Sequence, residues 1–272
     1  MSQSFTDCLR QLLPSVELVL SSQVLPDQDL KANCALNLAM LDDDLDTGVT
    51  DTKAIVSVCQ QYQIPLIHLS SYQVFSGDKK NVHNEKDVPS NSQNNLWFSA
   101  EAIVSAAIEK HIILRTSWLI SSRGKNLLSR LLAAFLNGEK IQVHRRLRGA
   151  PTAIDDFARV TIAIIKQIQT GADNWGVMHY CSSDHCNEEE FAEQVLQYLI
   201  QYQLLTAEPS LQLVDSEEES LSGAILGCRR LRDGFGIQAR SWRPNLLAMI
   251  KEWLADKQLV KNSATKKSKG KN

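Results

Sequence analysis

The sequence predicts an α/β fold with a mainly parallel sheet and helices on both of its faces. Two near-continuous apolar runs, IPLIHLS at 64–70 and HIILRTSW at 111–118, are typical of strands that are buried on both sides. Segments with helical periodicity alternate with such runs, which is how parallel strands are connected. The later segments are shorter and more irregular, and they predict a smaller lobe beside the sheet.

The first part of the chain is predicted to hold two short strands, over 16–20 and 34–40, and a helix over 53–62. A polar loop rich in Asn and Lys follows the strand at 64–70 and extends over 76–95. Apolar residues then recur at helical spacing over 97–109, which predicts a helix before the strand at 111–118.

The second half of the chain is predicted to be mainly helical, with helices over 128–137, 157–168, 187–198 and 244–254. Gly138 is suited to end the first of them in a left-handed conformation. Asn187 and Glu190 form a variant capping box at the start of the third. Pro244 opens the last, where its fixed φ and missing N–H are tolerated.

The composition excludes several classes of protein. With 43% hydrophobic and 22% charged residues among 272, the chain is neither disordered throughout nor a collagen. Six scattered cysteines predict reduced thiols, not a disulfide framework. No apolar run reaches the roughly 18 residues of a membrane span, and a net charge of −2 favours no nucleic-acid partner. We therefore expect a cytoplasmic protein, with a basic disordered tail over the lysine-rich 261–272.

A series of motifs follows the chain in a defined order: HLSSYQVFSG at 68–77, NEKDVP at 84–89, ILRTSWLIS at 113–121, GKNLL at 124–128, GAPTAIDDFAR at 149–159, WGVMHY at 175–180, EEFAEQV at 189–195 and WRPNL at 242–246. In these motifs the chain resembles the dTDP-4-dehydrorhamnose reductases, extended short-chain dehydrogenases that reduce a nucleotide-linked keto-sugar with a nicotinamide cofactor. The resemblance implies a single sugar-nucleotide-binding domain over 1–260. Its Rossmann-like part would cover about 1–140 and 155–170, and a substrate lobe the remainder.

The family's cofactor loop is missing from this sequence. The resemblance implies a glycine-rich turn after the first strand, where the backbone approaches a pyrophosphate at a helix N-terminus, but residues 1–47 contain no glycine. Only two candidate strands precede 64–70, fewer than one half of a doubly wound sheet would supply. The sequence therefore predicts a truncated or degenerate N-terminal part that binds neither NAD nor NADP.

The family's proton-transfer pair is missing as well. The resemblance implies a tyrosine as general acid, a lysine four residues later and a hydroxyl partner for the tyrosine. Ser71 stands at the hydroxyl position. Alignment on Ser99 puts Leu96 at the tyrosine position and Ala100 at the lysine position, and neither can transfer a proton. No other register restores the pair, because none of the nearest tyrosines has a lysine four residues later.

A basic cluster is the candidate binding element. Arg145, Arg146 and Arg148 precede the GAPT loop, which the resemblance places near the sugar-nucleotide site. Arginine binds phosphate with two parallel hydrogen bonds, so we predict that these residues bind substrate together with Arg115 and Thr152. The alternative is an ordinary solvated loop.

Two clusters of potential metal ligands are interpreted as structural. His179, Cys181, His185 and Cys186 fall partly in a predicted strand and partly in the loop after it, so they are not expected to converge on zinc. The acidic run at 42–46 lacks the glycine and the distal glutamate of a calcium loop. We expect no metal site.

The sequence thus predicts a divergent, non-catalytic relative of the reductases that has a binding or regulatory role and retains a nucleotide-sugar pocket. The same wider family contains the regulatory beta subunit of methionine adenosyltransferase, so a protein partner or a second copy of the chain stays open. The alternative is an active NAD(P)H-dependent reductase of a nucleotide-linked 4-keto-sugar in cell-surface polysaccharide biosynthesis. A third interpretation is a paralogue that retains no ligand.

Overall fold

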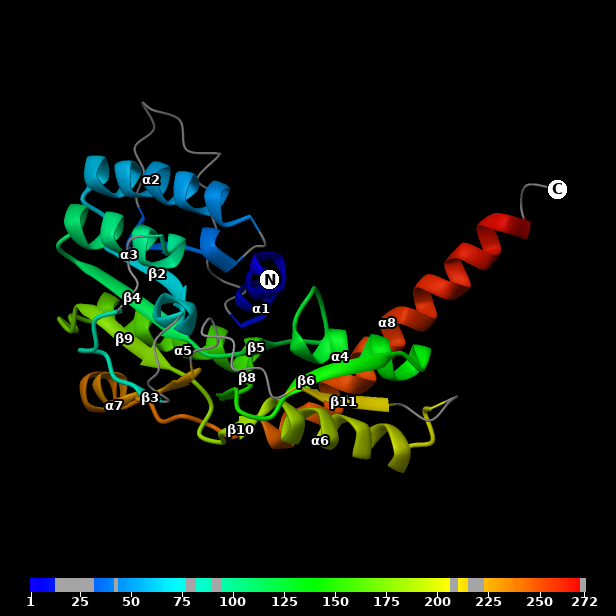
Figure 1. Ribbon diagram of the computed structural model, residues 1–272. Coiled ribbons are helices and arrows are strands. Elements are labelled where there is room, and N and C mark those ends of the chain that lie inside the picture. Colours follow the sequence, from blue (N-terminus) through cyan, green and yellow to red (C-terminus); the bar gives the residue numbers. More distant parts are fainter. Residues whose placement is uncertain are drawn as a thin grey trace.

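Four parallel strands form the central sheet in the computed structural model of the chain (Figure 1). In order across the sheet they are β1 (Ala35–Asn37), β2 (Leu66–Ser71), β4 (His111–Thr116) and β9 (Gly176–Tyr180). The strands predicted at 64–70 and 111–118 are confirmed. The strand predicted over 34–40 is shorter, because the chain turns into the 3-10 helix η2 (Ala39–Leu41) directly after β1.

The structure describes residues 1–12, 32–41, 44–76, 82–89, 94–205, 210–214 and 223–269. The strand predicted over 16–20 and part of the acidic run at 42–46 lie outside these residues. Within the described ranges, no helix is both long and apolar enough to cross a membrane.

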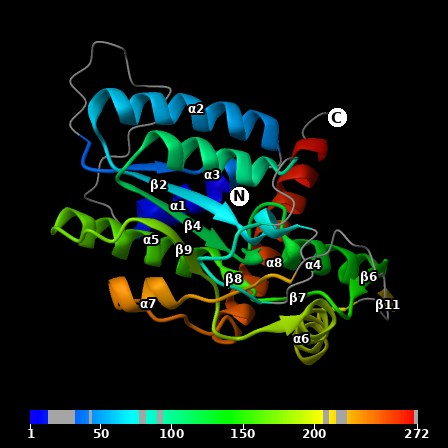
Figure 2. The ribbon, with the colours of Figure 1, turned by 60° about the vertical axis from the view of Figure 1, so that its left-hand side comes forward.

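One face of the sheet is covered by α2 (Leu45–Tyr62) and α3 (Leu96–Ala107), which lie side by side above it (Figure 2). Successive side chains of a strand point to opposite faces, so Leu66 of β2 and Ile113 of β4 share this face. They pack with Val56 of α2 in one buried cluster. The helix predicted over 97–109 is confirmed as α3.

Helix α2 begins earlier than the helix predicted over 53–62. The Asp44 side chain caps it, accepting a hydrogen bond from the Thr47 N–H at 3.1 Å. Gly48 then allows the first turn to approach η2, because a Cβ there would lie 2.9 Å from the Ala39 carbonyl oxygen. One member of the acidic run therefore has a structural role.

The other face of the sheet is covered by α5 (Ile154–Gln169) and by α1 (Ser2–Leu12), a helix that the sequence analysis did not identify. Ile67 and Leu69 of β2 point to this side and pack in one cluster with Phe5 of α1. This face is apolar along its length, as expected of a sheet buried on both sides.

A second hydrophobic core lies beside the sheet (Figure 1). It is enclosed by α4 (Leu127–Asn137), α6 (Glu188–Gln201), the first turns of α8 (Arg243–Lys269) and the parallel pair β6 (Lys140–His144) and β11 (Ser210–Val214). Its largest fully buried side chains are Phe135, Phe191 and Trp242. The predicted division assigns residues up to about 140 to the sheet part, whereas α4 packs in this second core.

Two predicted helix ends are confirmed by their geometry. Gly138 ends α4 in the left-handed region, at φ +66°. Asn187 and Glu190 form the capping box of α6, with both reciprocal hydrogen bonds present. The sequence predicts a disordered tail from residue 261, but in the structure α8 continues to Lys269. Lysine and alanine are good helix formers, and positive charge is favoured at a helix C-terminus.

Three pairs of two-residue strands connect the loops around the sheet: β5 (Leu119–Ile120) with β8 (Thr152–Ala153), β7 (Arg148–Gly149) with β10 (Cys186–Asn187), and β3 (Val82–His83) with β12 (Ile225–Leu226).

Candidate functional site

The carboxyl ends of the four parallel strands meet at one edge of the sheet, which is where open α/β sheets place their ligands. Ser71 is the last residue of β2, as the sequence predicts. Its Oγ accepts a hydrogen bond from the Gln73 N–H at 3.2 Å and so caps the short helix η3 (Tyr72–Phe75). Ser71 is therefore at the expected place, with its hydroxyl committed to the turn that follows.

A buried ion pair lies at this edge, between Glu101 of α3 and Arg115 of β4. Arg115 is 3% exposed, and its guanidinium donates to both carboxylate oxygens, with Nε 2.8 Å from Oε1 and Nη2 2.6 Å from Oε2. The Ser70 hydroxyl donates to Oε1 at 2.6 Å. The Phe75 ring lies against the guanidinium, its centre 5.0 Å from Cζ. Arg115, predicted to bind substrate, is thus enclosed and paired within the protein.

Two buried histidines of the central sheet lie near this ion pair, His179 opposite Arg115 and His68 two residues before Ser70. His179 of β9 is the register partner of Arg115, and burial, with the Arg115 charge, lowers its pKa to about 3. His68 of β2 is fully buried, and burial lowers its pKa to about 3. Its Nδ1 accepts from the Asn37 amide at 2.8 Å, an orientation fixed because the Asn37 oxygen accepts from the Ala39 N–H. Both histidines are therefore neutral in the folded protein near pH 7.

The start of α3 is where the resemblance implies a tyrosine and a lysine. Asn95 caps this helix and donates to the carbonyl oxygens of Gln73 and Val74, which fixes the helix against η3. Residues 94–107 contain neither a tyrosine nor a lysine, and the sequence has no tyrosine between Tyr72 and Tyr180. Ala100 is fully buried. This segment packs as part of the core and carries no proton donor of the expected kind.

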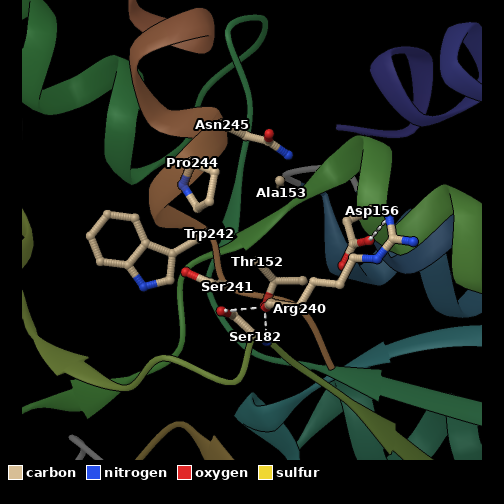
Figure 3. A pocket seen from close by; sticks show the side chains of 9 residues that line it. All are labelled: Thr152, Ala153, Asp156, Ser182, Arg240, Ser241, Trp242, Pro244 and Asn245. Carbon is tan, nitrogen blue, oxygen red and sulfur yellow. Dashed lines mark hydrogen bonds and ion pairs between the residues drawn. The ribbon is translucent and has the colours of Figure 1, made fainter. Parts of the chain in front are cut away.

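A cavity of about 290 Å³ opens beside the N-terminus of α5, where the sheet meets the second core (Figure 3). Ser182, just after β9, contributes one wall, and the segment leading into α8 contributes another. The residues that line it are Thr152, Ala153, Asp156, Ser182, Arg240, Ser241, Trp242, Pro244 and Asn245.

The walls of this cavity are held by a chain of hydrogen bonds. The Ser182 N–H donates to Thr152 Oγ1 at 3.1 Å, and the Ser182 hydroxyl donates to the Arg240 carbonyl oxygen at 2.9 Å. Thr152 N–H in turn donates to the Trp118 carbonyl oxygen at 2.7 Å. The Trp118 indole covers Gly149 so closely that a Cβ there would lie 2.3 Å from the ring. Trp118 of the LRTSW motif therefore supports the GAPT segment that lines the cavity, without lining it itself.

The charges at the cavity come from Asp156 and Arg240. The Asp156 carboxylate accepts hydrogen bonds from the Tyr180 hydroxyl and, at 2.8 Å, from Arg159 Nε. Burial and this carboxylate raise the pKa of Tyr180. The Arg240 side chain is 65% exposed, and its Nη1 lies 4.0 Å from Asp156. The cavity thus offers one accessible cation, one carboxylate and several hydroxyl and amide groups, a set suited to a sugar phosphate.

Of the five residues predicted to bind substrate, Thr152 lines this cavity. Arg145, Arg146 and Arg148 are exposed on the segment from β6 to β7, and none of them lines it. Arg145 pairs instead with Glu189, Nε to Oε2, at 3.0 Å. Sequence reasoning missed Arg240 and Ser182, although both adjoin the motifs at 242–246 and 175–180.

A second cavity, of about 810 Å³, lies around α7 (Arg229–Phe235) and the NEKD segment at 84–87. Its central cation, Arg230, donates to the carbonyl oxygens of Val177 and Trp175. The Arg230 backbone N–H donates to the Glu85 carboxylate at 2.9 Å. These groups are used to attach α7 to β9.

The cysteines and histidines at 179–186 do not converge. Cys186 lies in β10 and packs in the second core, whereas His179 and Cys181 belong to β9 and its end. In the part of the chain that the structure describes, no three histidine, cysteine or acidic side chains are placed to hold a metal ion together.

Comparison with known proteins identifies the family. Residues 41–255 match the family model described as the RmlD substrate binding domain. The chain belongs to this family. The resemblance inferred from the motifs is therefore confirmed, and the RmlD match includes strands β2, β4 and β9 of the sheet and the second core.

Curated relatives of this RmlD-family chain carry the name dTDP-4-dehydrorhamnose reductase. The protein of Sinorhizobium fredii is 25% identical over 205 residues, which is 73% of this chain and 69% of the relative. The protein of Aggregatibacter actinomycetemcomitans is 24% identical over 204 residues, 72% of this chain and 69% of the relative.

Solved structures with this fold include a dTDP-4-dehydrorhamnose reductase ortholog from Clostridium acetobutylicum, with a TM-score of 0.73 and 18% identity, covering 91% of this chain and 95% of that one. The Bacillus anthracis reductase in complex with NADP has a TM-score of 0.64 and 20% identity, covering 91% and 85%. The RmlD-family chain thus has an α/β fold with a parallel sheet like that of these enzymes.

The buried ion pair gives a test of how α3 is held on the sheet. Replacing Glu101 by leucine leaves the Arg115 charge buried without a partner, which should lower the free energy of unfolding by about 3–5 kcal/mol. The double variant Glu101→Leu with Arg115→Met removes both charges and should recover most of that loss. The control Glu109→Gln, at an exposed position, should change stability by less than about 0.5 kcal/mol. Urea unfolding measures all three, and a double variant as unstable as the single one would contradict the account.

The two buried histidines give a test in pH. Below about pH 6.5 the unfolded chain takes up a proton at each histidine, while the folded chain does so only near pH 3, so stability falls as the pH falls through this window. Between pH 6 and pH 5 the two together should remove about 2 kcal/mol. In His68→Gln the loss over the same interval should be smaller by about 1 kcal/mol, and in the exposed His185→Gln it should be unchanged. Equal losses in wild type and His68→Gln, measured by urea unfolding, would show that His68 is not buried and neutral.

Proposed function

We propose that this RmlD-family chain binds a nucleotide-linked sugar in the cavity beside α5 and does not reduce it. The observation that carries the proposal is a contrast within one molecule. Residues of the GAPT and WRPNL motifs line the cavity, and Trp118 of the LRTSW motif holds the GAPT segment in place, while the sequence lacks the glycine-rich turn and the tyrosine–lysine pair.

The topology of the sheet supports the absence of a dinucleotide site. In a doubly wound sheet the cofactor lies where the strand order reverses between two halves. Here the order β1-β2-β4-β9 adds each later strand on the same side, so the four described strands contain no reversal. The glycine-free stretch at 1–47 offers no tight turn for a pyrophosphate. We infer that neither NAD nor NADP binds here.

The missing proton donor supports the absence of reduction. Reduction of a keto-sugar places a negative charge on the carbonyl oxygen, which an acid must neutralise within hydrogen-bond reach. No tyrosine lies in α3 or between Tyr72 and its start, and the Tyr180 hydroxyl is held by Asp156, with its pKa raised by burial and by that carboxylate. Ser71 alone is too weak an acid to replace the missing tyrosine.

The cavity's groups support a sugar phosphate as the ligand. Arg240 is the accessible cation and would contact a phosphate, while the exposed Asn245 amide would hydrogen bond to sugar hydroxyls. The hydroxyls of Ser182 and Ser241 already donate to the Arg240 carbonyl oxygen and to Asp184 and fix the shape of the wall. The Asp156 carboxylate accepts hydrogen bonds only, so it favours a hydroxyl over a second phosphate. A cavity of about 290 Å³ is close to the lower limit for small-molecule sites, so we expect the nucleoside to extend beyond it.

A second candidate is an active nucleotide-sugar reductase, and the comparisons favour it. The two curated relatives are named as such reductases, and each alignment covers about 70% of both chains. Ser71 stands at the family's hydroxyl position. An active reductase needs a cofactor site and a proton donor for the sugar, and neither is among the features described above. An active reductase would use the same cavity for its substrate, so binding of a nucleotide sugar does not distinguish the two candidates.

The proposed binding site is tested by titration calorimetry with dTDP-rhamnose as the probe. A charge-assisted hydrogen bond contributes about 1.5–3 kcal/mol, so Arg240→Gln should weaken binding by about tenfold to a hundredfold. Arg229→Gln, an exposed arginine that pairs with Asp233 outside the cavity, is the matched control and should bind as wild type does.

The double variant Arg145→Gln with Arg148→Gln tests the anchor that the sequence predicts. If the cavity beside α5 is the site, this variant should retain wild-type affinity. Loss of binding there, with Arg240→Gln unaffected, would move the site to the β6–β7 segment. No binding of dTDP-rhamnose, dTDP or UDP-glucose to the wild-type chain would overturn the proposed function.

A further inference from the structure

Two cysteines that are distant in sequence meet beside the cavity. Cys181 directly follows β9, and Cys228 directly precedes α7. Their Sγ atoms lie 3.8 Å apart, across a sequence separation of 47 residues. The Leu226 carbonyl oxygen lies 3.3 Å from Cys181 Sγ and 3.4 Å from Cys228 Sγ, so either thiol can donate to it. The two sulfurs are therefore positioned side by side by one short segment of chain.

We propose that Cys181 and Cys228 form a dithiol site that hydrogen peroxide oxidises to a disulfide. A disulfide needs its sulfurs about 2.05 Å apart, so the pair must approach by less than 2 Å. The two side chains must rotate toward each other to close this gap.

The reaction balances with peroxide alone as oxidant. One thiolate attacks a peroxide oxygen, so that an S–O bond forms, the O–O bond breaks and hydroxide leaves, taking up the thiol proton as water. The second sulfur then attacks the sulfenyl sulfur, the S–S bond forms, and the S–O bond breaks to release a second water. In total two thiols lose two protons and two electrons, and one peroxide becomes two waters.

The surroundings of the pair favour reaction at this site. Cys181 is 1% exposed, but Cys228 is partly exposed and gives solvent a path to the pair. The hydrogen bond from the Cys228 thiol and a contact with His185 lower the pKa of Cys181, which favours the thiolate that reacts with peroxide.

The other cysteines lack these features. Burial raises the pKa of Cys34 to about 12, that of Cys59 to about 11 and that of Cys186 to about 12, so all three stay protonated. Cys8 lies on α1, and its thiol pKa is also raised by burial. Oxidation should therefore be selective for the pair at Cys181 and Cys228.

The cross-link would join two parts of the molecule. Ser182, a wall of the cavity beside α5, follows Cys181 immediately, and Cys228 anchors the start of α7. A disulfide that closes a long loop stabilises the folded state by restricting the unfolded chain. The oxidised protein should therefore melt at a higher temperature than the reduced protein.

The test uses the full chain, reduced, freed of reductant and treated with one equivalent of hydrogen peroxide. Free thiols are then alkylated, and the intact mass and the tryptic peptides are measured. We expect a loss of two alkylated thiols, a cross-linked peptide joining Cys181 and Cys228, and a rise in melting temperature that dithiothreitol reverses.

Three variants complete the test. Cys228→Ser should give no cross-link and no rise in melting temperature, whereas the matched control Cys186→Ser, a buried cysteine outside the pair, should give both. Circular dichroism establishes that each variant folds, and Cys181→Ser serves as a second pair variant. Full alkylation of Cys181 and Cys228 in the peroxide-treated wild-type chain, or a cross-link between other cysteines, would overturn the proposal.

Discussion

The carboxyl edge of the sheet depends on one buried ion pair, between Glu101 of α3 and Arg115 of β4. Burying two charges is favourable only when each is also fully hydrogen bonded. Here the guanidinium donates to both carboxylate oxygens, and Ser70 supplies a further donor. The pair locks α3 onto β2 and β4, and it leaves the arginine at this edge with no free charge for a ligand. Ligand binding must therefore rely on charges elsewhere, and Arg240 at the neighbouring cavity is accessible.

The order of the family motifs has a physical reason in this fold. The motif ending at Trp118 and the motif beginning at Gly149 are separated by α4 and β6, yet Trp118 covers Gly149 and accepts from the Thr152 N–H. The WRPNL motif lines the same cavity directly, and Ser182 donates to the Arg240 carbonyl oxygen just before it. These contacts join the sheet to the second core, and they have been retained in a chain that lacks the glycine turn and the tyrosine–lysine pair.

Much of the fold could be predicted from the sequence. Strands buried on both sides give continuous apolar runs, and helices give apolar residues that recur every three or four positions. The site could be predicted only in part. Arg145, Arg146 and Arg148 are conspicuous because they fall within four residues, but the segment from β6 to β7 places them on the outside. Arg240 is a single exposed arginine, and only its position beside the cavity in the folded chain identifies it as a candidate binding residue. The partner of Arg115 was hidden as well, since Glu101 meets it only through the packing of α3 on the sheet.

The central claim is that the family's sugar-nucleotide cavity persists here without a working cofactor site. Titration calorimetry of the full chain with NADPH, in the presence of saturating dTDP-rhamnose, tests it most directly, because a bound sugar nucleotide would complete any shared site. The account predicts no heat of binding at NADPH concentrations up to about 1 mM, which corresponds to a binding free energy weaker than about −4 kcal/mol. Saturable binding with micromolar affinity would contradict it, and the active-reductase candidate would take its place.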